Sequence, residues 1–121
     1  MNVAVWAGVM VIGGLGSVAR FMVDRAVSRR AARSFPFGTL VVNVSGALFL
    51  GLVTALALPP AVKLLAGTAL LGAYTTFSTW MLETQRLTEE RQIWPAVANI
   101  VVSVGLGIAA ALTGQWIASL W

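Results

Sequence analysis

The sequence contains no cysteine and no histidine, and only 10% of its 121 residues are charged. Without cysteine there are no disulfides, no thiolate metal sites and no cysteine nucleophiles. Without histidine the chain lacks the commonest metal ligand and the commonest general base. The remaining residues supply no acid–base pair and no nucleophile–base set, so we do not expect an enzyme.

Hydrophobic residues make up 59% of the chain, which is more apolar surface than a soluble domain of this length can bury. The net charge is +4, but the basic residues are few and lie in short stretches between apolar runs. That arrangement does not predict nucleic-acid binding. The stretch Val3–Val18 has no basic region before it and no small-residue cleavage site, and it is interpreted as a retained span.

Four apolar stretches are long enough to cross a bilayer, which takes about 20 residues per helix. The predicted spans are Val3–Val23, Leu40–Leu58, Ala61–Leu82 and Ile93–Ile117. The connections are Asp24–Ser34, Pro59-Pro60 and Gln85–Arg91. The sequence therefore predicts an all-α membrane protein with four transmembrane helices in one domain, residues 1–121.

The charges predict the orientation of these helices. The first and third connections share one side of the membrane, and their basic residues are Arg25, Arg29, Arg30, Arg33, Arg86 and Arg91. The other side carries only Lys63. The positive-inside rule then places the arginine-bearing connections in the cytoplasm and both termini outside the cell membrane.

Polar residues within the predicted spans require a physical reason, because they are expensive in hydrocarbon. The candidates are Arg20, Asn43, Ser45, Thr75, Thr76, Ser78, Thr79, Glu83, Asn99 and Ser103. Hydroxyl groups can bond to carbonyls of their own helix. The amide of Asn43 cannot satisfy itself in this way, so we expect either a pore-lining role or a hydrogen bond between helices.

The run Thr75-Thr76-Phe77-Ser78-Thr79 lies in the third predicted span, just after Gly72. Its low helix propensity predicts a break in that span, with Gly72 permitting it. Irregular backbone at membrane depth is tolerated where it is buried in protein or lines a cavity. Freed carbonyls there suit a hard cation such as Na⁺, whereas hydroxyl and amide donors suit an anion. A polar helix face packed on its neighbours is the alternative.

Phe77 and Trp80 are three residues apart and share a face if both are helical. Such pairs usually serve packing or lipid contact, but an aromatic edge can also face an anion. Glu83 follows at the end of the predicted span, where an interfacial anchor or an ion-pair partner is expected.

Four motifs in order along nearly the whole chain resemble the Fluc (CrcB) family of fluoride channels. They are Gly13-Gly14-Leu15-Gly16 with Arg20-Phe21; Phe35-Pro36-Phe37-Gly38-Thr39-Leu40 with Asn43 and Gly46; Gly72–Thr79 with Glu83; and Ser103 with Gly107. The resemblance implies an antiparallel, dual-topology dimer with two fluoride pores at its interface. It also implies a structural Na⁺ at the dimer centre, held by the main-chain carbonyls of Gly72 and Thr75.

The same resemblance assigns roles to individual side chains. It implies that Asn43, Phe77 and Ser103 line the fluoride pore together with the aromatic residue at Trp80, and that Arg20 lies in the vestibule. Supporting roles fall to Thr39, Thr76, Ser78, Thr79, Glu83 and Asn99.

Two positions depart from the family pattern. Trp80 stands where phenylalanine is usual, and Asn99 stands where the fourth span usually carries tyrosine. Either change could alter conduction or inactivate one of the two pores. The arginine bias is a third departure, because a dual-topology homodimer needs one sequence to insert both ways. We therefore expect pairing with an oppositely oriented homologous subunit, with a homodimer as the alternative.

The expected function is passive, selective fluoride export from the cytoplasm, which lowers fluoride toxicity. The alternative is a non-conducting or one-pore partner subunit of a heterodimeric channel. A small multidrug-type transporter is less favoured, because the predicted first span has no embedded carboxylate. The expected partners are the fluoride ion, the lipid bilayer and a second channel subunit.

Overall fold

The computed structural model describes residues 2–31 and 33–121, which form helices joined by short connections and contain no strand. The elements in chain order are α1 (Val3–Arg30), α2 (Phe37–Ala55), α3 (Pro60–Lys63), the π-helical segment η1 (Leu64–Leu71), α4 (Gly72–Tyr74), α5 (Ser78–Glu89) and α6 (Ile93–Ala118). By length and composition α1, α2 and α6 are able to cross a membrane. The predicted all-α class with four helical stretches is confirmed.

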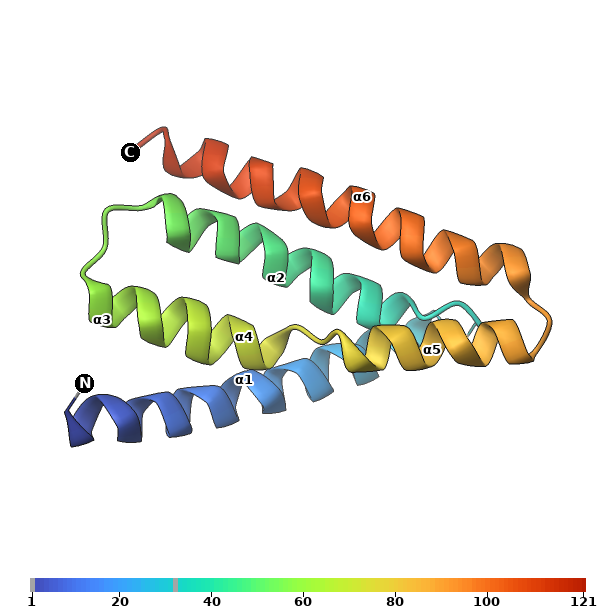
Figure 1. The fold of residues 1–121 in the computed structure, drawn as a ribbon, viewed down its shortest axis with the longest axis horizontal. Helices are drawn as coiled ribbons and strands as arrows, with labels where there is room; N and C mark the ends of the chain where they lie inside the picture. The colour runs from blue at the N-terminus through green and yellow to red at the C-terminus, as the bar shows by residue number, and fades with distance from the viewer. Residues whose placement is uncertain (1, 32) are drawn as a thin grey trace.

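The helical stretches run up and down beside one another, and both termini lie at the same end of the bundle (Figure 1). Helix α2 packs along α6, whereas α1 packs on η1, α4 and α2. Helix α5 leans onto α6. Large apolar side chains remain exposed along α1 and α6, as expected for faces that contact lipid.

The helices extend beyond the predicted spans at the arginine-bearing end. Helix α1 continues to Arg30 rather than ending at Val23, so Arg25 and Arg29 are helical rather than in a loop. The reason is that arginine is a good helix former and that a helix does not need to end at the membrane surface. Helix α5 likewise continues to Glu89, seven residues beyond the predicted end at Leu82.

Helices α2 and α6 approach closely because glycine removes the side chain at their contacts. A Cβ at Gly51 would collide with the carbonyl of Ala111, and a Cβ at Gly114 would collide with the carbonyl of Leu48. Each helix therefore lies against the backbone of the other, as small residues permit in membrane bundles. By contrast, Gly107 has nothing near its missing side chain.

The third stretch is not one regular helix. Its first part is π-helical, and its α-helical geometry at Gly72–Tyr74 ends before Thr75. Gly72 itself has φ −63° and ψ −37°, which are ordinary helical values. The backbone therefore leaves the helix three residues after Gly72, within the hydroxyl run.

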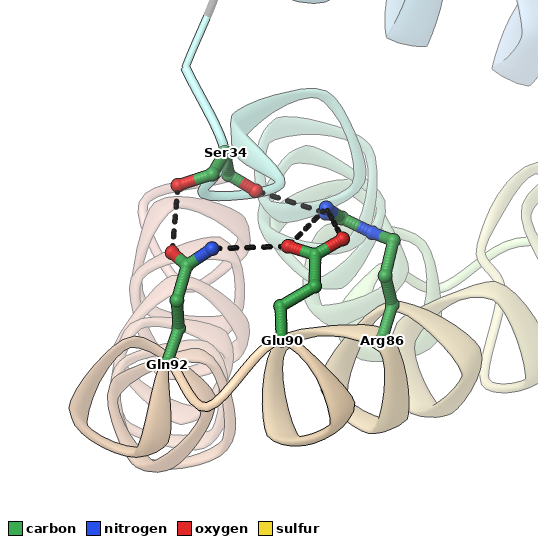
Figure 2. A network of polar contacts seen from close by, with 4 residues as sticks. All are labelled: Ser34, Arg86, Glu90 and Gln92. Atoms are coloured by element: carbon green, nitrogen blue, oxygen red, sulfur yellow. Dashed lines mark hydrogen bonds and ion pairs between the residues drawn. The ribbon is translucent and has the colours of Figure 1, made fainter.

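Polar contacts join the two connections at the arginine-bearing end (Figure 2). Arg86 on α5 donates to the main-chain carbonyl of Ser34 at 2.9 Å, and the Ser34 hydroxyl donates to Gln92 at 2.9 Å. Glu90 accepts from Gln92 at 3.0 Å and lies 3.5 Å from Arg86. These contacts hold the α1–α2 connection against the α5–α6 turn, which confirms that the two connections share one end.

Candidate functional site

The centre of the site is the non-helical backbone between α4 and α5. Thr75 is extended, with φ −77° and ψ 157°, and α5 begins at Ser78. The hydroxyl of Thr75 donates to the carbonyl of Leu71 at 3.0 Å, so its side chain folds back on the preceding turn. The hydroxyl of Thr76 bonds to that of Thr79 at 3.0 Å. Hydroxyl residues thus replace part of the helical hydrogen bonding here.

Asn43 on α2 holds this backbone in place. Its Oδ1 accepts from the main-chain N–H of Thr76 at 2.8 Å, and its Nδ2 donates to the main-chain carbonyl of Thr76 at 2.9 Å. One side-chain amide therefore satisfies both polar groups of a residue that has left the helix. Asn43 bonds from α2 to the non-helical backbone and also lines a groove described below, so a structural hydrogen bond and a place at the pore do not exclude each other.

The close approach of α2 to this backbone depends on Gly46. A Cβ at Gly46 would collide with the Cγ2 methyl of Thr75. Gly46 lies one turn from Asn43 along α2, so the same helix face supplies both the space and the hydrogen bonds.

Two main-chain carbonyls have no helical hydrogen-bond donor, because the helix is interrupted after Tyr74. In a continuous helix the N–H of Thr76 would bond to the carbonyl of Gly72, and the N–H of Thr79 to that of Thr75. Here the N–H of Thr76 bonds to Asn43, and the N–H of Thr79 bonds to the Thr76 hydroxyl at 3.3 Å. The oxygens of Gly72 and Thr75 are therefore available as ligands for a hard cation.

A groove of about 390 Å³ runs along the non-helical backbone, between α2, α5 and α6. It is lined by Asn43, Phe77, Trp80 and Ser103, which are the four residues predicted for the pore, together with Thr75, Thr76 and apolar side chains of α2 and α6. The rings of Phe77 and Trp80 meet edge to face, with centroids 5.8 Å apart and an interplanar angle of 82°. Phe77 is 70% exposed, so one wall of the groove is open.

A second cavity of about 220 Å³ lies between α1, α2 and the non-helical backbone. Four of its lining residues were predicted as vestibule or supporting residues, namely Arg20, Thr39, Thr76 and Thr79. Thr76 lines this cavity as well as the groove, so the hydroxyl run forms the wall between them.

Asp24 also lines the second cavity, although the sequence placed it in a loop. It follows Arg20 by four residues, and on a helix that continues past Val23 the two share a face. The unexpected length of α1 is the reason that Asp24 was missed. Tyr74, the only tyrosine of the chain, was missed as well, and its hydroxyl lies 3.0 Å from that of Ser45.

Three of the predicted supporting residues lie outside both cavities. Glu83 is half-buried on α5, where its carboxylate accepts a hydrogen bond from the buried hydroxyl of Thr39 on α2. Ser78 is exposed at the start of α5. Asn99 is completely buried between α5 and α6, where its Nδ2 donates to Thr84 at 2.9 Å. Asn99 therefore ties two helices together rather than facing the groove.

The fold and the site together define a small helical membrane protein whose interrupted helix lines a groove. A family model described as CrcB-like protein, Camphor Resistance (CrcB), matches residues 7–115, and the chain belongs to this family. It is 69% identical over 119 residues to "Fluoride-specific ion channel FluC 2" of Mycolicibacterium paratuberculosis, with 98% of each chain covered. It is 67% identical over 120 residues to a protein of the same name from Mycobacterium tuberculosis, covering 99% of this chain and 95% of the relative.

A more distant relative carries a different number in its name. "Fluoride-specific ion channel FluC 1" of Leifsonia xyli subsp. xyli is 44% identical over 124 residues, covering 99% of this chain and 90% of the relative. The similarity extends over nearly the full length in each case, so it includes every element that builds the two cavities.

Proposed function

We propose that this chain is one subunit of a fluoride-selective channel that lets fluoride leave the cytoplasm passively. The observation that carries the proposal is the groove, which gathers Asn43, Phe77, Trp80 and Ser103 against non-helical backbone. The choice of fluoride as the ion comes from the names of its relatives. Among the described residues that line the groove there is no carboxylate, which weighs against a proton-coupled multidrug-type transporter.

Selectivity in this proposal comes from a narrow route with few donors. A fluoride ion that loses water there is compensated by the amide of Asn43, by hydroxyl groups and by the positive edge of the Phe77 ring. The apolar remainder of the wall offers nothing to a larger hydrated ion. No pump is needed, because a negative interior favours anion exit by about 2.3 kcal/mol per charge per 100 mV.

The proposal includes a structural Na⁺ at the carbonyls of Gly72 and Thr75. The residues present fit such an ion, because the N–H groups that would occupy these oxygens are bonded elsewhere. Backbone oxygen ligands suit a hard cation, whereas the described part of the chain has no cluster of three or more carboxylate, thiol or imidazole groups for a transition metal. When bound, the ion would add a fixed positive charge beside the groove.

A second subunit in the opposite orientation is the third part of the proposal. The groove is open on one wall and Phe77 is mostly exposed, so a partner that covers this wall would close the route. The arginines gather at one end of the bundle, which favours a single orientation for this chain and therefore a homologous partner. Its relatives carry the names FluC 2 and, in another organism, FluC 1, and this numbering supports the existence of more than one subunit type in the family. The partner would complete two pores, or only one if Trp80 obstructs the pore that this chain lines.

Fluoride efflux from liposomes tests the proposal. The chain is reconstituted alone and together with candidate homologous subunits, with and without Na⁺ in the buffer. We expect fluoride-selective efflux that depends on Na⁺ and on the partner. Efflux by clean homodimers would contradict the heterodimer, efflux unaffected by Na⁺ would contradict the cation site, and no fluoride efflux in any combination would contradict the channel.

A further inference from the structure

The indole of Trp80 reaches from α5 across to α6. Its Nε1 donates to the main-chain carbonyl of Asn99 at 3.0 Å. The side chain of Asn99 reaches back, and its Nδ2 donates to the hydroxyl of Thr84 at 2.9 Å. That hydroxyl in turn donates to the main-chain carbonyl of Trp80 at 2.9 Å. Hydrogen bonds from α5 to α6 and from α6 to α5 therefore hold the Trp80 ring in one position against α6.

Hydroxyl groups on the helices of this protein commonly donate to the carbonyl four residues earlier. Ser17, Thr54, Thr84 and Thr113 all do so, at distances from 2.7 to 3.2 Å. The corresponding acceptor for Ser103 is the carbonyl of Asn99, since both lie on α6. That carbonyl is the one that the Trp80 indole occupies.

A carbonyl oxygen has two lone pairs, and both are in use at Asn99. The main-chain N–H of Ser103 takes one as part of the helix, and the Trp80 indole takes the other. Consistent with this, the Ser103 oxygen is buried and has no hydrogen-bond partner among the described residues. Ser103 nevertheless lines the groove, and we expect a rotation about its χ1 to turn the buried hydroxyl toward a ligand there.

We infer that Trp80 is a positioning residue for Ser103: by occupying the Asn99 carbonyl, its indole N–H keeps the Ser103 hydroxyl free to donate to a small anion in the groove. The inference rests on the proposed function, since fluoride is the anion. It also gives a physical role to the position at which this chain departs from its family pattern. A phenylalanine at this position has no N–H and would leave the carbonyl open to Ser103.

A double-mutant cycle in the fluoride-efflux assay tests this role. In the wild-type background, Ser103→Ala removes a free donor and lowers efflux about tenfold, as expected for a hydrogen bond to a charged ligand. In the Trp80→Phe background the hydroxyl bonds to its own helix, so Ser103→Ala lowers efflux less than about twofold. The cycle compares the effect of Ser103→Ala within each background, so any change of pore width caused by Trp80→Phe cancels.

The matched control is Trp116→Phe, because Trp116 lies exposed near the end of α6 and away from the groove. Ser103→Ala keeps its full effect in that background. An equal effect of Ser103→Ala in the wild-type and Trp80→Phe backgrounds overturns the inference and leaves the channel function intact. A wild-type chain without fluoride efflux in any subunit combination removes the proposed function and this inference with it.

A second measurement reports on the indole without transport. The ultraviolet resonance Raman difference between the wild-type protein and Trp80→Phe isolates the Trp80 indole from the other four tryptophans. We expect the lost signal to be that of a strongly hydrogen-bonded N–H, whereas Trp116→Phe loses a signal of a different N–H environment. A weakly bonded Trp80 N–H overturns the inference whatever the efflux assay gives.

Discussion

The groove and the second cavity lie on opposite sides of the hydroxyl run, and they differ in the groups that line them. The groove has one amide, a few hydroxyls and two aromatic rings in an otherwise apolar wall. The second cavity has a full charge of each sign, Arg20 and Asp24. Charges attract ions from water over several ångströms, whereas neutral donors act only at contact. We propose that, in a fluoride channel, the second cavity captures ions and the groove selects among them.

The largest expected effect comes from Asn43→Leu, which removes both hydrogen bonds to Thr76. The N–H and C=O of a non-helical residue are then left without partners, so we expect at least a hundredfold loss of fluoride efflux and a destabilisation of about 3 kcal/mol. Asn43→Asp is the matched control, because it still accepts from the Thr76 N–H but cannot donate. Its loss of stability should be intermediate in thermal unfolding, whereas its efflux also falls because a carboxylate in the groove repels an anion. Equal losses of stability for the two variants would contradict the role of both bonds.

The next largest effect is expected at Phe77, where fluoride efflux and dimer assembly are measured separately. Phe77→Ile keeps an apolar side chain but removes the aromatic edge, and we expect about a tenfold loss of efflux with dimer assembly unchanged. The control Phe49→Ile changes an exposed ring on α2 outside the groove. Size-exclusion chromatography reports assembly beside the efflux assay. Unchanged efflux for Phe77→Ile would remove this ring from the ion route.

A smaller effect, with a different salt dependence, is expected in the second cavity. Arg20→Gln removes a charge that attracts anions, so efflux should fall about threefold at low ionic strength and less at high ionic strength, where the Debye length is short. Arg29→Gln is the control, because Arg29 is exposed on α1 and lies outside the cavity. A salt-independent loss, or the same loss for both variants, would contradict a capture role.

The smallest effect belongs to the contacts at the arginine-bearing end. Arg86→Gln removes the hydrogen bond to the Ser34 carbonyl and the ion pair with Glu90. Both groups of the ion pair are partly exposed, so we expect less than about 1 kcal/mol of destabilisation and no change in efflux. A substantial loss of efflux would show that this end of the bundle also controls the groove. The two cavities alone would then not account for the ion route.

The residue types of the site were predictable, whereas their partners were not. Asn43 could be chosen from the sequence because a side-chain amide cannot satisfy itself within its own helix. Its partner Thr76 depends on how α2 packs against the hydroxyl run, with Gly46 providing the space. Asn99 is a second example. The family resemblance implied a supporting role for it, and packing decides what it contacts: it lies between α5 and α6, bonded to Thr84.

The lengths of the helices were predicted less well than their number. Hydropathy marks where a chain meets lipid, and it says nothing about where a helix ends in water. The prediction therefore ended the first helix too early. In the structure Arg25, Arg29 and Asp24 lie on α1 rather than in a loop, and Asp24 lines the second cavity together with Arg20. Gly72 shows a similar limit, because glycine permits unusual backbone but does not require it, and here it is helical.

The sequence by itself determined the membrane environment, the four helical stretches, the family and the polar residues that need partners. Those properties follow from composition and from the order of residue types along the chain. Only the tertiary structure decided which groups meet: Asn43 with Thr76, Trp80 with the Asn99 carbonyl, and Thr39 with Glu83. Such pairings join residues far apart in sequence, and they depend on helix packing within ångströms, which no local pattern encodes.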